Sequence, residues 1–198
     1  MTTYFCMRHG LTEWNQESRI QGNTDTSLCD EGREMAQKWA ESLAEHTFDY
    51  ILTSGLKRAR ETAEIINEVL GLPIQDDPRL AEQDWGDWTG LTKAQLKKAA
   101  WKKVQQQEKQ GFEFRPPGGE SRNEVLMRAC DALLDFNAEH KDASVLVVTH
   151  NGVIKCLSYI LSGLEFMPGD PLPIEPYCLH RIECLENELA IGELNIKL

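Results

Sequence analysis

The chain has 198 residues, a formal net charge of −11 at pH 7 and an apolar fraction of 41%. This length suits one domain with a sizeable core, and the charged fraction of 27% is ordinary, which excludes a disordered or fibrous chain. The acidic balance argues against nucleic acid as a partner, because that affinity depends on clustered lysines and arginines. No stretch approaches the roughly 18 apolar residues of a membrane span, so we expect no membrane association.

Six cysteines are spread along the chain without a CxxC pair, far below the density of a disulfide scaffold. Most lie within apolar stretches and are expected to be small buried side chains. The first residues contain neither a basic segment nor a long apolar run. Together these features predict a cytoplasmic protein.

Strand-like and helix-like patterns alternate along the chain. In chain order the sequence predicts a strand at 3–7, a helix at 28–43, a strand at 49–53, a helix at 56–70, a strand at 73–75, helices at 91–110 and 120–136, a strand at 144–149, a helix at 152–161, and strands at 178–185 and 188–195. Ser27 or Asp30 is expected to cap the first helix, and Gly71 is expected to end the second. The continuous apolar run at 144–149 is typical of a buried parallel strand.

This alternation predicts an α/β fold, a three-layer α/β/α sandwich with a mostly parallel central sheet. Without an internal repeat or linker, residues 1–198 are predicted to form a single domain. A polar helix rich in Lys and Gln, followed by a Pro-Gly break, indicates a cap-like insertion at about 84–120 that lies over the sheet. The apolar C-terminal stretch 191–198 either pairs with a second copy, giving a homodimer, or covers its own sheet edge.

Three of the best strands lead into residues that bind anions. Ligand sites in open α/β sheets gather beyond the carboxyl ends of the strands. The first strand runs into Arg8 and His9, the second leads to Arg58, and the buried strand ends at His150. Arginine forks match phosphate oxygens, and helix N-termini add backbone donors. Each residue alone has a structural explanation, but their common location predicts a pocket for a phosphoryl group.

Several sequence blocks resemble those of the histidine phosphatase superfamily, in its phosphoglycerate-mutase-like branch. They follow the family's order and span most of the chain. The blocks are Arg8-His9-Gly10-Leu11-Thr12 with Asn15, Arg19-Ile20-Gln21-Gly22 with Asp25, Ser54-Gly55-Leu56-Lys57-Arg58-Ala59, Arg79-Leu80-Ala81-Glu82, Pro117-Gly118-Gly119-Glu120-Ser121 and Thr149-His150-Asn151-Gly152. Together they are far more specific than any one of them.

The resemblance implies a nucleophile and an acid. His9 would attack phosphorus through one ring nitrogen and form a phosphohistidine, with the proton of its other nitrogen held by the Gly10 carbonyl. Glu82 would protonate the leaving oxygen and later activate water.

The resemblance also implies the groups that hold the substrate. Arg8, Arg58 and His150 would bind the equatorial phosphoryl oxygens, where phosphoryl transfer places its charge. The further candidates for phosphate or substrate contact are Asn15, Gln21, Gly22 and Asn151. Asn151 replaces the glycine that is common in the family, and because asparagine tolerates a positive φ, we expect the backbone to be preserved.

The activity implied is that of a phosphomonoester hydrolase acting on a small phosphorylated metabolite without a metal or a cofactor. No Cys/His cluster has metal-ligand spacing. The alternative is a cofactor-dependent phosphoglycerate mutase, which shares the first half-reaction. The acidic block at 82–87 lacks the added Arg or His of a mutase and favours the hydrolase. A catalytically inactive regulatory protein is a further alternative, against which the complete residue set stands. Nothing in the sequence identifies the metabolite.

Overall fold

The computed structural model describes residues 1–171 and 173–198, and a six-stranded sheet forms its centre. Four parallel strands lie in the order β3, β2, β4, β1, and β5 and β6 extend the sheet beyond β1 as an antiparallel hairpin. The strands are β1 (Thr2–Arg8), β2 (Tyr50–Thr53), β3 (Ile74–Asp76), β4 (Ser144–Thr149), β5 (Leu179–Leu185) and β6 (Glu188–Ile196).

The helices are α1 (Glu13–Gln16), α2 (Asp30–Leu43), α3 (Lys57–Leu70), α4 (Lys93–Glu108), α5 (Arg122–Glu139) and α6 (Asn151–Leu161), with short 3-10 turns at Pro78–Leu80, Gly86–Trp88 and Gly111–Glu113. Among the helices of the described ranges, none has the length and apolar character needed to cross a bilayer. Every predicted strand and helix is present, with ends that shift by at most three residues.

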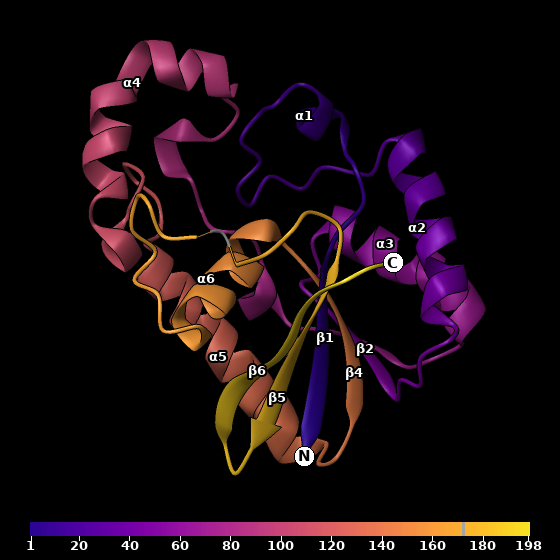
Figure 1. The fold of residues 1–198 in the computed structure, drawn as a ribbon. Helices are drawn as coiled ribbons and strands as arrows, with labels where there is room; N and C mark the ends of the chain where they lie inside the picture. Colours follow the sequence, from indigo (N-terminus) through magenta and orange to yellow (C-terminus); the bar gives the residue numbers. More distant parts are fainter. Residues whose placement is uncertain (172) are drawn as a thin grey trace.

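Side chains of β4 alternate between two hydrophobic cores, because successive residues of a strand point to opposite faces of the sheet. Val145 and Val147 belong to the core under α5 and α6, whereas Leu146 and Val148 belong to the core under α2 and α3. Figure 1 shows these two helix pairs on opposite sides of the sheet. The predicted three-layer fold with a mostly parallel sheet is therefore confirmed.

The start of α2 differs from its prediction. Neither Ser27 nor Asp30 caps the helix, which begins after Cys29 without a side-chain cap. The N–H of Cys29 donates to the carbonyl of Leu11, and the N–H of Leu28 donates to the Glu61 carboxylate. Neighbouring segments thus hold this turn, and a reading of local sequence could not reveal them. At the end of α3, by contrast, Gly71 adopts the expected left-handed conformation, with φ of 65°.

The segment after Glu82 carries α4 beyond the carboxyl ends of the parallel strands, at the upper left of Figure 1. The sequence predicts a solvated helix here, and most of α4 is exposed, but Leu96 and Val104 are buried against Trp88 and Phe114. This small satellite core holds α4 over the end of the sheet.

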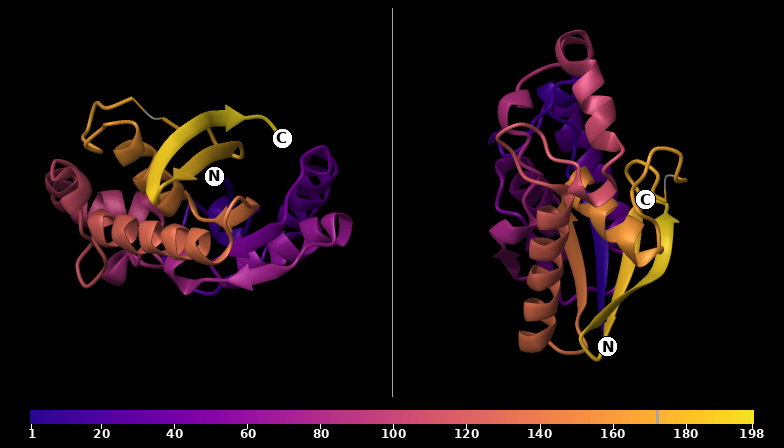
Figure 2. Two further views of the ribbon diagram at one scale, coloured as in Figure 1. Left: turned by 90° about the horizontal axis from the view of Figure 1, so that it is seen from below. Right: turned by 90° about the vertical axis from the view of Figure 1, so that its left-hand side faces the viewer.

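The C-terminal hairpin forms one edge of the sheet, and both views of Figure 2 place it on the side away from β2 and β3. β6 covers the edge of β5 within the chain. A homodimer formed through β6 stays a prediction.

Close approach of two backbones fixes the loop that follows β1. A Cβ atom on Gly32 in α2 would collide with the carbonyl oxygen of Leu11, and one on Gly10 would lie 2.6 Å from the Gly32 oxygen. We expect Gly32→Ala to lower the free energy of unfolding by about 1–3 kcal/mol, because the well-packed backbones must separate. Urea titration measures the loss, with Gln37→Ala at an exposed position of the same helix as control. Equal stability of the two variants would contradict the expected close packing.

Candidate active site

His9 lies directly after β1, at the carboxyl edge of the sheet. Its buried ring places Nδ1 2.7 Å from the carbonyl oxygen of Gly10, and Arg58 donates from Nε to His9 Nε2 at 3.2 Å. Because arginine can only donate, Nε2 is the unprotonated nitrogen and the proton sits on Nδ1 against the Gly10 carbonyl. Two contacts thus define the same tautomer of a neutral ring.

The surroundings also set the charge of the site histidines. Burial lowers the pKa of His9 well below its ordinary value, and the positive charges of Arg8 and Arg58 lower it further. Burial, followed by the charge of Arg58, acts in the same direction on the pKa of His150. The two rings lie 5.1 Å apart between centroids, and both are neutral at pH 7.

Arg58 projects from the first turn of α3 and is fully buried. Its guanidinium donates to the carbonyl oxygens of Thr24 at 2.7 Å and Gly22 at 2.8 Å, in addition to His9. Burial lowers its pKa to about 10, against the attraction of the Glu82 carboxylate. Arg58 therefore links His9 to Gly22, which the sequence predicts to contact the substrate.

Arg8 precedes His9 in the chain, His150 packs against the His9 ring, and each of the two contains a buried nitrogen. Arg8 Nε and His150 Nδ1 are buried and have no hydrogen-bond partner among the residues that the structure describes. His150 Nε2 lies 2.7 Å from Ser54 Oγ, and the Arg8 guanidinium lies 5.6 Å from the ring centroid of Tyr177. Buried polar atoms without partners are rare in native proteins, and such atoms at a cavity are typical of a ligand site.

Glu82 reaches the same site from the loop after the Pro78–Leu80 turn. Its carboxylate accepts hydrogen bonds from the Gly152 N–H at the start of α6, at 3.1 and 3.3 Å, and from the Gln83 N–H at 2.9 Å. A Cβ atom on Gly152 would collide with the Glu82 carboxylate. The glycine of the last sequence block therefore allows this close approach.

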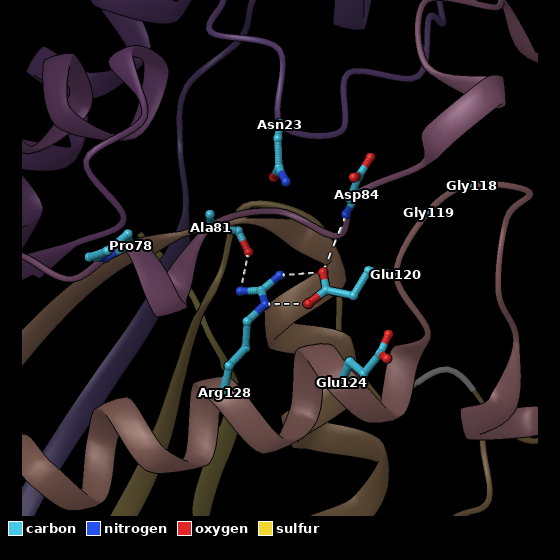
Figure 3. Close-up of a pocket in the computed structure, with 9 residues that line it drawn as sticks. All are labelled: Asn23, Pro78, Ala81, Asp84, Gly118, Gly119, Glu120, Glu124 and Arg128. Atoms are coloured by element: carbon cyan, nitrogen blue, oxygen red, sulfur yellow. Dashed lines mark hydrogen bonds and ion pairs between the residues drawn. The ribbon is translucent and has the colours of Figure 1, made fainter.

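An ion pair between Arg128 of α5 and Glu120, which lies just before that helix, supports the Glu82 loop beside a pocket of about 370 Å³ that is drawn in Figure 3. Arg128 binds both oxygens of the Glu120 carboxylate, at 2.7 and 2.9 Å. It also donates to the carbonyl oxygens of Arg79 at 2.5 Å, Ala81 at 2.7 Å and Glu82 at 3.2 Å. Glu120 belongs to one of the predicted sequence blocks, but Arg128, eight residues later, was not predicted as part of the site.

Two amides present donors to the site. The Asn15 oxygen accepts from the N–H of Thr12, and the Gln21 oxygen accepts from the hydroxyl of Thr26. The Thr12 hydroxyl, which has one proton to donate, lies 3.1 Å from both amide oxygens. With each amide oxygen occupied, the NH2 group is the free end, and both residues line the central cavity. The first of these contacts belongs to the capping box of α1, a helix that the sequence analysis leaves as loop.

Asn151 differs from its expectation. It is the first residue of α6, directly after His150, and its φ is not positive. Tolerance of a left-handed backbone is therefore not the reason that asparagine fits here. Asn151 does line the cavity, and its contact with substrate stays a prediction.

Most of the predicted site residues line one cavity of about 440 Å³. The predicted site residues that line it are Arg8, His9, Asn15, Gln21, Gly22, Arg58, Glu82 and Asn151. His150 lies behind this wall, against His9 and Ser54. The lining also includes Trp85 and Phe114, which belong to the small core under α4, together with Lys93, Glu108 and Arg122. None of these five is among the predicted site residues.

In the described part of the chain, no group of three or more His, Cys, Asp or Glu side chains is placed to hold a metal ion.

Comparison with known proteins identifies the family. Residues 4–197 match the histidine phosphatase superfamily (branch 1), so the chain belongs to this superfamily, as the sequence blocks predict. It is 33% identical to a Bacillus subtilis protein named "Uncharacterized phosphatase PhoE", over 99% of this chain and 95% of that protein. It is 37% identical to the glucosyl-3-phosphoglycerate phosphatase of Mycolicibacterium vanbaalenii, over 85% of this chain and 76% of that one.

The solved structures agree with this assignment. Bacillus stearothermophilus YhfR superimposes with a TM-score of 0.88 at 29% sequence identity, over 100% of this chain and 98% of that one. Membership and fold are thus confirmed together, and relatives named as phosphatases support an enzyme that hydrolyses phosphomonoesters.

The buried neutral histidines predict a loss of stability in mild acid. A histidine whose pKa is lowered in the folded state binds fewer protons than in the unfolded chain, so stability falls as the pH drops below about 6.5. The pKa values of His9 and His150 are lowered in the folded state, and burial lowers the pKa of His180 to about 4. We expect each to remove about 1 kcal/mol from the free energy of unfolding between pH 7.5 and 5.5. Urea titrations of wild type and His180→Gln measure this, and a wild type equally stable at both pH values would contradict it.

Proposed function

We propose that this protein is a phosphomonoester hydrolase in which His9 accepts the phosphoryl group before water does. The observation that carries the proposal is the single tautomer of a neutral His9, whose unprotonated Nε2 lies against Arg58 in the cavity wall. A neutral imidazole with one unprotonated ring nitrogen is a nucleophile, and the arginines beside it can stabilise the charge of a phosphoryl group.

The first step joins His9 Nε2 to phosphorus while the bond between phosphorus and the leaving oxygen breaks. Protonated Glu82 gives its proton to that oxygen, and an alcohol departs. In the second step the Glu82 carboxylate takes a proton from water, and the water oxygen bonds to phosphorus as the N–P bond breaks. Inorganic phosphate and free His9 result. The groups proposed to hold the phosphoryl oxygens are Arg8, Arg58, His150, Asn15 and Gln21.

The cavity of about 440 Å³ suits a small phosphorylated metabolite, and Gly22 and Asn151 stay predicted substrate contacts. A single domain, a cytoplasmic location and the lack of a nucleic-acid partner also remain predictions from the sequence.

Replacing the nucleophile tests the proposal. We expect His9→Ala to reduce kcat for p-nitrophenyl phosphate by on the order of 10³-fold or more, because no other group in the site can take its place. Brief incubation of wild type with ³²P-labelled substrate should trap a phosphoprotein that is labile in acid and stable in base. His46→Ala, at an exposed position, is the control. Equal rates for His9→Ala and wild type would overturn the assignment.

The same preparation separates hydrolase from mutase. With 3-phosphoglycerate and a bisphosphoglycerate primer, a hydrolase releases phosphate faster than it forms 2-phosphoglycerate. Faster isomerisation than phosphate release would instead assign the mutase reaction to this chain.

The role of Glu82 predicts a dependence on the leaving group. An alkoxide needs protonation more than a dinitrophenolate does, so Glu82→Gln should lower kcat/KM for an alkyl phosphate by about 10²–10⁴-fold and that for 2,4-dinitrophenyl phosphate far less. Arg128→Met should show the same pattern at about 10–100-fold, because Arg128 positions the Glu82 loop.

Arg115→Met is the matched control for Arg128→Met, because Arg115 pairs with Glu124 on the same helix and is more exposed. Its profile across leaving groups should match that of wild type. A loss in Arg128→Met that is equal for both substrates would show a general structural role and contradict the positioning of Glu82.

A further inference from the structure

Three of the arginines differ from the rest because they form no ion pair with a carboxylate of the described residues. Seven of the ten arginines in the sequence lie within 4.0 Å of a carboxylate oxygen, at positions 19, 33, 60, 79, 115, 128 and 181. Within residues 1–171 and 173–198, Arg8, Arg58 and Arg122 have no such partner, and all three line the central cavity. Arg8 and Arg58 are accounted for by the proposed phosphoryl site. Arg122 is not.

Arg122 is held firmly at the start of α5. Its guanidinium carbon lies 3.9 Å from the ring centroid of Phe166 and 4.2 Å from that of Phe114, and Nη1 donates to the carbonyl oxygens of Gly111 and Phe166. Within the described residues both hydrogen bonds of the guanidinium come from Nη1, which leaves Nε and Nη2 without a partner, and Arg122 lines the cavity. The aromatic rings cover the faces of the guanidinium, and the carbonyl groups occupy Nη1. The edge formed by Nε and Nη2 is therefore open to a ligand.

The charges around Arg122 favour an anion. Burial lowers the pKa of Arg122 to about 10, much as it does for Arg58. Lys155 is a second cation in its field, since burial and then the charge of Arg122 lower the pKa of that amine. Lys93 lines the same cavity, and Glu108 opposes these cations from more than 4.0 Å away. Arg122 is half-buried. A partly desolvated cation without a close counterion is costly, and an anionic ligand offsets that cost.

We infer that Arg122 forms a second anion subsite, so that the preferred substrate is a phosphomonoester whose leaving alcohol carries an anionic group, a carboxylate or a second phosphate. This inference rests on the proposed function, because it places the phosphoryl group at His9 and the second anion at the far end of the same cavity. The open edge of a guanidinium binds either group through paired N–H donors.

Matched substrates test it. One series contains phosphate monoesters of ω-hydroxy carboxylic acids with three to six carbons, and the other contains the monophosphates of the diols with the same carbon number. We expect the wild-type ratio of kcat/KM, carboxylate over diol, to peak at one chain length at about 10–100, the range of a charge-assisted hydrogen bond. In Arg122→Met this ratio should fall to about one. Because the ratio is measured within one variant, a general loss of activity cancels.

The controls separate the outcomes. Arg115→Met removes a paired arginine close to α5 and should keep the wild-type ratio. Bisphosphates of the same diols form a third series, and an Arg122-dependent preference for them alone would identify phosphate as the second anion. A wild-type ratio near one in both charged series, or a ratio that Arg122→Met leaves unchanged, would overturn the inference. If wild type hydrolyses no series faster than His9→Ala, the proposed function itself fails.

Discussion

The guanidinium of Arg58 is the contact on which the rest of the site depends. It is buried, has no carboxylate partner among the described residues, and joins α3 to two other segments, because it donates to His9 after β1 and to Gly22 and Thr24 in the following loop. The contact with His9 decides which ring nitrogen keeps its lone pair, while the carbonyl contacts fix the loop that carries Gln21. A lysine could not make these contacts at once, because its ammonium lacks the planar fork. One side chain thus sets both the chemistry of the nucleophile and the shape around it.

This arrangement explains how an acidic protein provides a site for an anion. The net charge of −11 describes mainly a shell in which most arginines are already neutralised by carboxylates. The cavity collects the arginines that are not neutralised, and burial there lowers the pKa of Arg58 and Arg122. Close charges in a poorly solvated cavity outweigh distant charges screened by water. The composition therefore predicts the charge of the outer surface, whereas the charge of the site depends on the arginines that form no ion pair within the described residues.

The sequence was informative where function follows from topology. Parallel strands direct their carboxyl ends to one edge, so His9 and Arg58 could be placed together without any coordinates. It was uninformative where a role depends on which element packs against which. Arg128 reads as an ordinary helical residue until α5 is seen beside the Glu82 loop, and Arg122 until two phenylalanines are seen around it. The predicted cap of α2 was wrong for the same reason, because Glu61 from α3 accepts a hydrogen bond from the Leu28 N–H just before the helix.

Arg122 and Arg128, which the sequence did not reveal as site residues, both lie on α5 and serve different parts of the site. Arg122 and Arg128 are six residues apart, about 9 Å along the axis at 1.5 Å per residue, and they face different neighbours. One lines the end of the cavity that would hold the leaving group, and the other braces the loop whose carboxyl group would protonate that group. Residues 84–120 lead directly into α5, whereas Arg8 and His9 lie at the end of β1 and His150 lies between β4 and α6. Changes in that segment can therefore alter which alcohol is recognised without moving the buried strands that position the phosphoryl group.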